Sequence, residues 1–135
     1  LFRSSIGQFI VTGGDWISNT QYQIRVRGGV GISIGAYSKT NRVNVGNGTG
    51  VAIQVRDACT GHIDYTDIHD TATGIQVTNA SRVTIVNGTF NKCVIGYSAE
   101  AVSTCAHDVT TTFTDVSQMF QTKQNGVAGQ DSATN

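Results

Sequence analysis

The feature that most constrains this chain is an internal repeat of 22 residues between Gly50 and Ser98. Four of its five leading pairs are apolar on both sides: Ile53, Val55, Ile63, Tyr65 and Ile68 recur as Ile75, Val77, Ile85, Asn87 and Phe90. A fixed period in the twenties is typical of stacked repeats, whose units bury their apolar faces only against one another. Stacking at about 4.8 Å predicts an inner ladder of residues 53, 75 and 97, with Gln54 over Gln76 outside.

Weaker traces of the period extend the stack in both directions. Upstream, Ile32 and Ile34 precede Ile53 and Val55 by 21 positions, and Val43 and Val45 precede Ile63 and Tyr65 by 20. The segment Val11-x-x-Gly14-x-Trp16 also matches Ile85-x-x-Gly88-x-Phe90. We therefore predict five to six coils over residues 8–120, after a lead-in or cap at 1–7. Residues 121–135 are expected to form a polar tail, disordered or ordered only against a partner.

Composition favours short strands and turns over helices. Charged residues make up 13% of the chain, Gly occurs 16 times, and Pro is absent. No segment has the apolar spacing of an amphipathic helix. The net charge is zero and no basic run occurs, so we expect no nucleic-acid partner. No apolar run approaches the roughly 18 residues of a membrane span, so we expect no membrane insertion.

The cysteines indicate structure rather than chemistry. Cys59, Cys93 and Cys105 are odd in number, and their spacing is neither that of a disulfide framework nor that of a metal site. We expect buried, reduced thiols that act as small hydrophobic side chains. We expect no metal and no cofactor. The sequence begins at Leu1 rather than Met, so we also expect a fragment or processed product of a longer chain.

The segment "SRVTIVNGTFNKCVIGYS" at 81–98 resembles the coil pattern of right-handed parallel β-helix proteins. In that pattern a V-x-I strand precedes an Asn/Gly corner, an inward aromatic residue and a short G-I strand. The family includes pectate lyases, polygalacturonases, and the tailspikes and depolymerases of bacteriophages. The resemblance implies an all-β, right-handed parallel β-helix, a single-stranded β-solenoid.

Within this family, the Asn-, Thr- and Gly-rich composition with few charges looks most like a phage tailspike or tail-fibre segment. That resemblance implies a structural segment that binds a host receptor or glycan. It also implies a homotrimer, contacts with other virion tail proteins and with bacterial surface polysaccharide, and a virion location after folding in the host cytoplasm. A bacterial surface adhesin or carbohydrate-binding module, extracellular or at the cell surface, is a further alternative.

The densest polar cluster lies between His62 and Asp70. Its carboxylates, Asp64, Asp67 and Asp70, are the candidate catalytic residues of a polysaccharide hydrolase or lyase acting on capsule or O-antigen. Glycoside hydrolysis needs two carboxylates, one of them held protonated as an acid. The competing interpretation is that these Asp side chains cap turns, and we lean towards a fragment that is not an enzyme.

Four exposed side chains are candidates for glycan contact: Tyr37, Lys39, His62 and His69. Tyr37 is an aromatic residue close to a corner, where its ring face could stack on a sugar. Trp16 and Tyr97 align with inward positions, so we assign both to the core.

Overall fold

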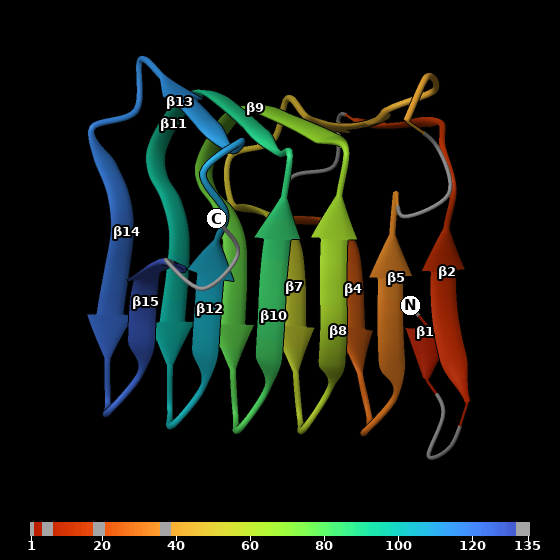
Figure 1. Cartoon of the computed structure of the whole chain (residues 1–135), viewed down its shortest axis with the longest axis vertical. Helices are drawn as coiled ribbons and strands as arrows, with labels where there is room; N and C mark the ends of the chain where they lie inside the picture. Colours follow the sequence, from red (N-terminus) through yellow and green to blue (C-terminus); the bar gives the residue numbers. More distant parts are fainter. Residues whose placement is uncertain (1, 4–6, 18–20, 36–38, 132–135) are drawn as a thin grey trace.

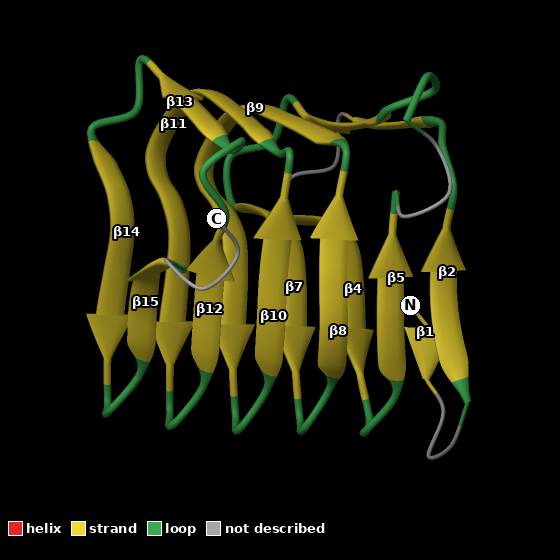
Figure 2. Ribbon diagram, in the orientation of Figure 1, coloured by secondary structure: helices red, strands yellow, loops and turns green. Residues whose placement is uncertain are grey.

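The computed structural model describes residues 2–3, 7–17, 21–35 and 39–131 (Figure 1). These residues form a parallel β-solenoid of about five turns with a spacing of about 23 residues. No helix occurs among them, and so none that is long and apolar enough to cross a membrane (Figure 2). The predicted fold class is therefore confirmed.

Two sheets face each other across the core. Sheet A has the order β1-β4-β7-β9-β11, extended by β14, and sheet B has the order β15-β12-β10-β8-β5-β2. Shorter corner pairings join β3 to β6, β6 to the first half of the bent strand β9, and β13 to the first half of the bent strand β11. The strands are β1 (Phe2–Arg3), β2 (Gln8–Val11), β3 (Asp15–Ile17), β4 (Tyr22–Arg27), β5 (Gly31–Ile34), β6 (Val43–Gly46), β7 (Val51–Arg56), β8 (Thr60–Asp64), β9 (Thr66–Thr78), β10 (Arg82–Val86), β11 (Thr89–Glu100), β12 (Thr104–His107), β13 (Thr112–Thr114), β14 (Gln118–Lys123) and β15 (Val127–Gln130).

The predicted ladders are present. Ile53 pairs in register with Ile75, and Ile75 with Tyr97, and all three side chains are fully buried. On the opposite face of the same strands, Gln54 Nε2 donates a hydrogen bond of 2.6 Å to Gln76 Oε1. The 22-residue repeat therefore gave both the inner apolar ladder and the outer amide ladder correctly.

The upstream extension of the repeat was wrong in register. Ile34 pairs with Ile63 in sheet B, whereas Ile53 stacks on Ile24 in sheet A. Val45 likewise pairs with Ile68 instead of Tyr65. The second coil is longer than its neighbours because extra residues separate β5 from β6. Strands of both sheets alternate apolar and polar residues. A strand of sheet B could therefore be aligned by mistake with a strand of sheet A, at a spacing close to the repeat.

The sharp turns from sheet A into sheet B hold the coils in register. From β4 onwards, each of these turns has two successive residues with positive φ, such as Asp57–Ala58 and Asn79–Ala80, and the turns stack at the lower edge of Figure 1. The Ala58 N–H donates to the Asn79 carbonyl at 2.9 Å, and Asn79 Nδ2 donates to Asp57 Oδ1 at 2.9 Å. Hydrogen bonding thus continues through the corner and offsets the cost of left-handed backbone.

The stack extends beyond residue 120. Strand β14 pairs with β11 and β15 pairs with β12, so the ladders reach Gln130 within the segment expected to be a polar tail. The inner ladder that begins at Ile24 and passes through Ile53, Ile75 and Tyr97 ends at Phe120. Phe120 is partly buried against the core. At the other end, Trp16 pairs in register with Val45 but is 38% exposed, so its assignment to the core was wrong. The reason is that β3 pairs with β6 on one side only among the described strands.

Candidate functional site

The three predicted carboxylates have different partners. Asp64 ends β8 on the outer face of sheet B, Asp67 lies in the corner part of β9, and Asp70 lies at the next turn with a φ of 49°. No hydrogen bond joins any two of these carboxyl groups in the described residues. The chain therefore distributes them around the coil instead of pairing them.

Asp67 is tied to two neighbouring coils. Its Oδ1 accepts from Arg42 Nε at 2.6 Å and from Thr89 Oγ1 at 2.7 Å. Arg42 Nη2 also donates to the Asn87 carbonyl at 2.6 Å, and its guanidinium lies 6.0 Å from the centre of the Tyr65 ring. Both charged side chains are partly exposed, so the ion pair adds little stability but fixes both groups in place.

His69 joins Asp70 to two more side chains. Its Nδ1 lies 2.8 Å from Asp70 Oδ2, and its Nε2 lies 2.7 Å from Asn44 Oδ1. Asn44 Nδ2 donates to Asp15 Oδ1 at 3.1 Å, which fixes the orientation of the amide. Both imidazole nitrogens thus have an oxygen of a neighbouring side chain within hydrogen-bonding distance.

These groups belong to a continuous row of polar side chains, which we call the polar strip. The corner strands that carry it, including β13 and the first parts of β9 and β11, lie along the upper edge of Figure 1. Because the strands pair in register, its side chains form two neighbouring columns. The first column is Asp15, Asn44, Asp67, Thr89 and Thr112, and the second contains His69, Asn91 and Thr114.

Sequence reasoning missed Asp15 and Asn44 as members of this strip, and Arg42 as the partner of Asp67. A signal was present, since Asn44 and Asp67 lie 23 positions apart and Asp67 and Thr89 lie 22 apart. The misplaced register of the second coil concealed it.

Sheet B carries a separate pair of titratable groups. His62 Nδ1 lies 3.4 Å from Asp64 Oδ2, and the His62 side chain is 55% exposed. Asp64 is buried, and its Oδ1 has no hydrogen-bond partner. Burial raises the pKa of Asp64, the nearby His62 opposes that rise, and the charge of Asp108 adds to it.

The predicted glycan-binding residues do not share one face. His69 lies in the polar strip, whereas His62 lies on sheet B. Lys39 is exposed in the segment between β5 and β6, and Tyr37 lies outside the described residues.

The solenoid interior becomes polar towards β12. The buried His107 Nδ1 lies 2.7 Å from the Tyr97 hydroxyl, which donates to the Gly129 carbonyl at 3.1 Å. These contacts assign an N–H to Nδ1 of a neutral imidazole. Burial lowers the pKa of His107, and the charge of Asp108 opposes that effect.

The cysteines are free and buried, as predicted. Burial raises the pKa of Cys93 to about 11 and raises that of Cys105 further. In the described part of the chain, no three His, Cys, Asp or Glu side chains gather into a group that could hold a metal ion.

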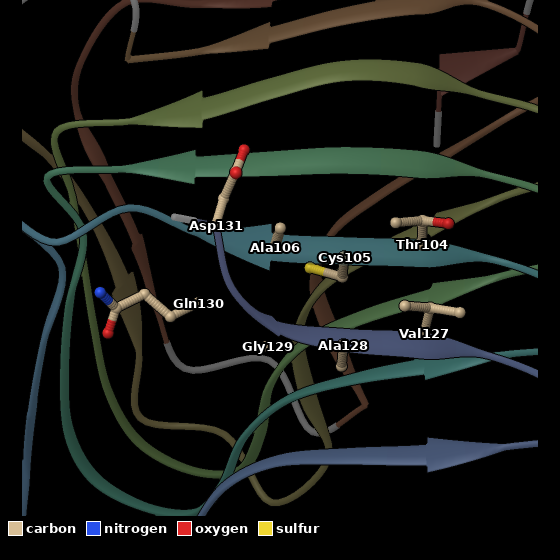
Figure 3. A pocket seen from close by; sticks show the side chains of 8 residues that line it. All are labelled: Thr104, Cys105, Ala106, Val127, Ala128, Gly129, Gln130 and Asp131. Atoms are coloured by element: carbon tan, nitrogen blue, oxygen red, sulfur yellow. The ribbon is translucent and has the colours of Figure 1, made fainter. Parts of the chain in front are cut away.

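A shallow depression of about 310 Å³ lies at β12 and β15 (Figure 3). Small side chains and backbone make up most of its wall. Its lining contains the carboxylate of Asp131 but no histidine, lysine or arginine side chain that could act with it as an acid–base pair. Its lining residues are Thr104, Cys105, Ala106, Val127, Ala128, Gly129, Gln130 and Asp131.

Comparison of the sequence and structure with known proteins gives no indication of function. No protein-family model matches this chain, and no curated protein or solved structure matches it either.

Proposed function

We propose that this chain is a structural and glycan-binding segment of a phage tail fibre or tailspike, and that the polar strip contacts bacterial surface polysaccharide. The observation that carries the proposal is that the strip is fixed by its own hydrogen bonds. Asp67 is held by Arg42 and Thr89, and His69 is held by Asp70 and Asn44. Side chains already ordered lose less conformational entropy when a ligand binds.

The spacing of the strip also suits an extended ligand. Successive coils repeat at about 4.8 Å, so carboxylates, amides and hydroxyls recur along the solenoid axis. These groups can accept from and donate to the hydroxyls of several sugar units in one chain. The exposed Trp16 at one end of the corner strands adds an aromatic face suited to a sugar ring.

The proposal includes a homotrimer carried in the virion tail alongside other tail proteins. A solenoid exposes strand edges at its ends, and subunit contacts would protect them. Light scattering tests this part, and a stable monomer over the micromolar range would contradict it.

Binding to a panel of capsular and O-antigen polysaccharides, measured by calorimetry, tests the glycan-binding role. Replacement of Asp67 or Asn91 by Ala is expected to weaken binding about tenfold, which is about 1.4 kcal/mol. The matched control is Thr60→Ala, an exposed position on sheet B, which should bind as the parent does. Equal affinity of all three variants and the parent would exclude the strip as the binding surface.

One observation favours a second candidate, a polysaccharide hydrolase or lyase. Burial raises the pKa of Asp64, as a general acid requires. Its partner carboxylate would be Asp67 or Asp70, although these already bind Arg42 and His69. Sugar release from capsule or O-antigen, measured for Asp→Asn variants at the three positions, separates this candidate from binding alone. No release by the parent chain would remove it.

A bacterial surface adhesin would use the same strip. The neighbouring genes in the source genome distinguish it from a phage protein.

A further inference from the structure

The outer face of sheet B holds a serine, a histidine and an aspartate in neighbouring positions. Ser33 of β5 pairs in register with His62 of β8, so their Cα atoms lie on adjacent parallel strands about 4.8 Å apart. Both side chains point away from the core, because Ile32, Ile34 and Ile63 point into it. Neither belongs to the polar strip.

Asp64 lies two residues beyond His62 on the same face. Its Oδ2 lies 3.4 Å from His62 Nδ1, which leaves Nε2 on the opposite edge of a ring whose side chain is 55% exposed. The Asp64 carboxylate is itself held in place by burial, with a residue exposure of 9%. An imidazole whose Nδ1 faces a buried carboxylate is oriented to accept a proton at Nε2.

We propose that Ser33, His62 and Asp64 act as nucleophile, general base and positioning residue in the hydrolysis of small acyl esters, such as acetyl esters. The proposal is independent of glycan binding, which uses the corner strands. Ser33 is the nucleophile because its primary hydroxyl is less hindered than that of Thr84, which pairs with His62 from the other side.

The reaction runs in two balanced steps. In the first, Ser33 Oγ attacks the acyl carbon, His62 Nε2 takes the hydroxyl proton, and the ester C–O bond breaks as the alcohol oxygen leaves with that proton. In the second, Nε2 takes a proton from water, whose oxygen attacks the acyl-serine. The bond to Ser33 Oγ breaks, Oγ recovers the proton, and the carboxylic acid is released.

Hydrolysis of p-nitrophenyl acetate by the full chain tests the proposal. We expect His62→Ala and Ser33→Ala to lower the rate about 100-fold or more. Asp64→Asn should lower the rate and also change its pH profile, because it removes the carboxylate that faces His62 Nδ1. The matched control is Thr84→Val, which should retain the parental rate. Circular dichroism checks that each variant folds.

Covalent labelling identifies the nucleophile directly. A fluorophosphonate probe should modify the parent at Ser33, as mapped by peptide mass spectrometry, and the His62→Ala variant should not react. The proposal is overturned by a parental rate no higher than that of free N-acetylhistidine, by full activity of Ser33→Ala, or by loss of activity in Thr84→Val. A label on any other residue overturns it too.

Discussion

The interior of the solenoid differs between its middle coils and its last ones. In the middle coils, the ladders are aliphatic, as in Ile24, Ile53 and Ile75. In the later coils, the same ladder continues as Tyr97 and Phe120. The inward ladder of the corner strands also changes from aliphatic to aromatic residues, since Val45 and Ile68 are followed by Phe90 and Phe113.

The backbone keeps its register across this change because small residues make room for the rings. A Cβ at Gly74 would lie 2.8 Å from Phe90 Cδ1, and a Cβ at Gly96 would lie 2.8 Å from Phe113 Cε1. The corresponding position in the preceding coil is Ala52, which is fully buried. The two regions therefore share one architecture but depend on different packing, and each prediction below acts on that difference.

The largest effect is expected at the rings. Phe90→Ala should lower the free energy of unfolding by about 3–5 kcal/mol, because Phe90 is fully buried and stacks on Phe113 at 5.0 Å between ring centres. Ile68→Val, one coil earlier in the same ladder, should cost about 0.5–1.5 kcal/mol. Urea unfolding measures both values. Equal losses would show that the aromatic region adds no stability of its own.

A methyl group at Gly96 should destabilise the chain by about 1–3 kcal/mol, because it would overpack Phe113 and meet the Met119 carbonyl. The control is Gly31→Ala, where the nearest atom to a new Cβ is Gln8 Cγ at 3.6 Å, an ordinary contact. Thermal unfolding compares the two variants. If Gly31→Ala is as harmful as Gly96→Ala, the contact with the Phe113 ring does not explain the loss at Gly96.

Removal of the Tyr97 hydroxyl should cost about 1–1.5 kcal/mol, because Tyr97→Phe leaves His107 Nδ1 and the Gly129 carbonyl without this partner. Amide hydrogen exchange should show the loss of protection first in β12 and β15. Uniform loss over all coils would mean that the last coil unfolds only together with the rest.

Acid should weaken the aromatic region through His107. Because burial lowers the pKa of His107 in the folded chain, the unfolded chain binds the proton more readily. The free energy of unfolding should therefore be highest above the ordinary value of 6.5 and should decrease as the pH falls below it. His107→Leu, which continues the ladder of Ile63 and Ile85, should remove this part of the pH dependence.

The smallest effect has the opposite sign and arises in the middle coils. Because burial raises the pKa of Asp64, its charged form is disfavoured in the folded chain. Asp64→Asn should therefore stabilise the chain near pH 7, and this gain should vanish in acid, below the ordinary value of 3.8. Urea unfolding at both pH values measures it. A constant gain across pH would point to a cause other than charge.

Much of this fold could be predicted from sequence because ladder partners repeat at a nearly constant spacing. The pairs at 22 residues identified the solenoid and its buried ladders. The candidate site was less predictable. Asp64, Asp67 and Asp70 are close in sequence, but successive segments of a coil point in different directions.

The partners of those carboxylates come from other coils. Arg42 reaches Asp67 across 25 positions, and Asn44 reaches His69 across the same interval. That interval of 25 differs from the coil spacing of about 23 residues. The two partners therefore lie on adjacent coils but are not directly opposite each other along the strands. A search for the regular spacing alone therefore passes over these contacts.

The sequence by itself determined that this chain stacks its coils, since apolar residues at a fixed period can be buried together only in that way. It also determined the inward and outward sides of the best-preserved strands. Only the tertiary structure decided which polar groups meet. The longer second coil sets the register of the strands before it, and so places Ser33 beside His62, 29 positions away. Asn44 follows the extra residues and meets Asp67 at the ordinary spacing of 23 positions. Side chains on adjacent coils interact through this register, which the local sequence around each residue does not specify.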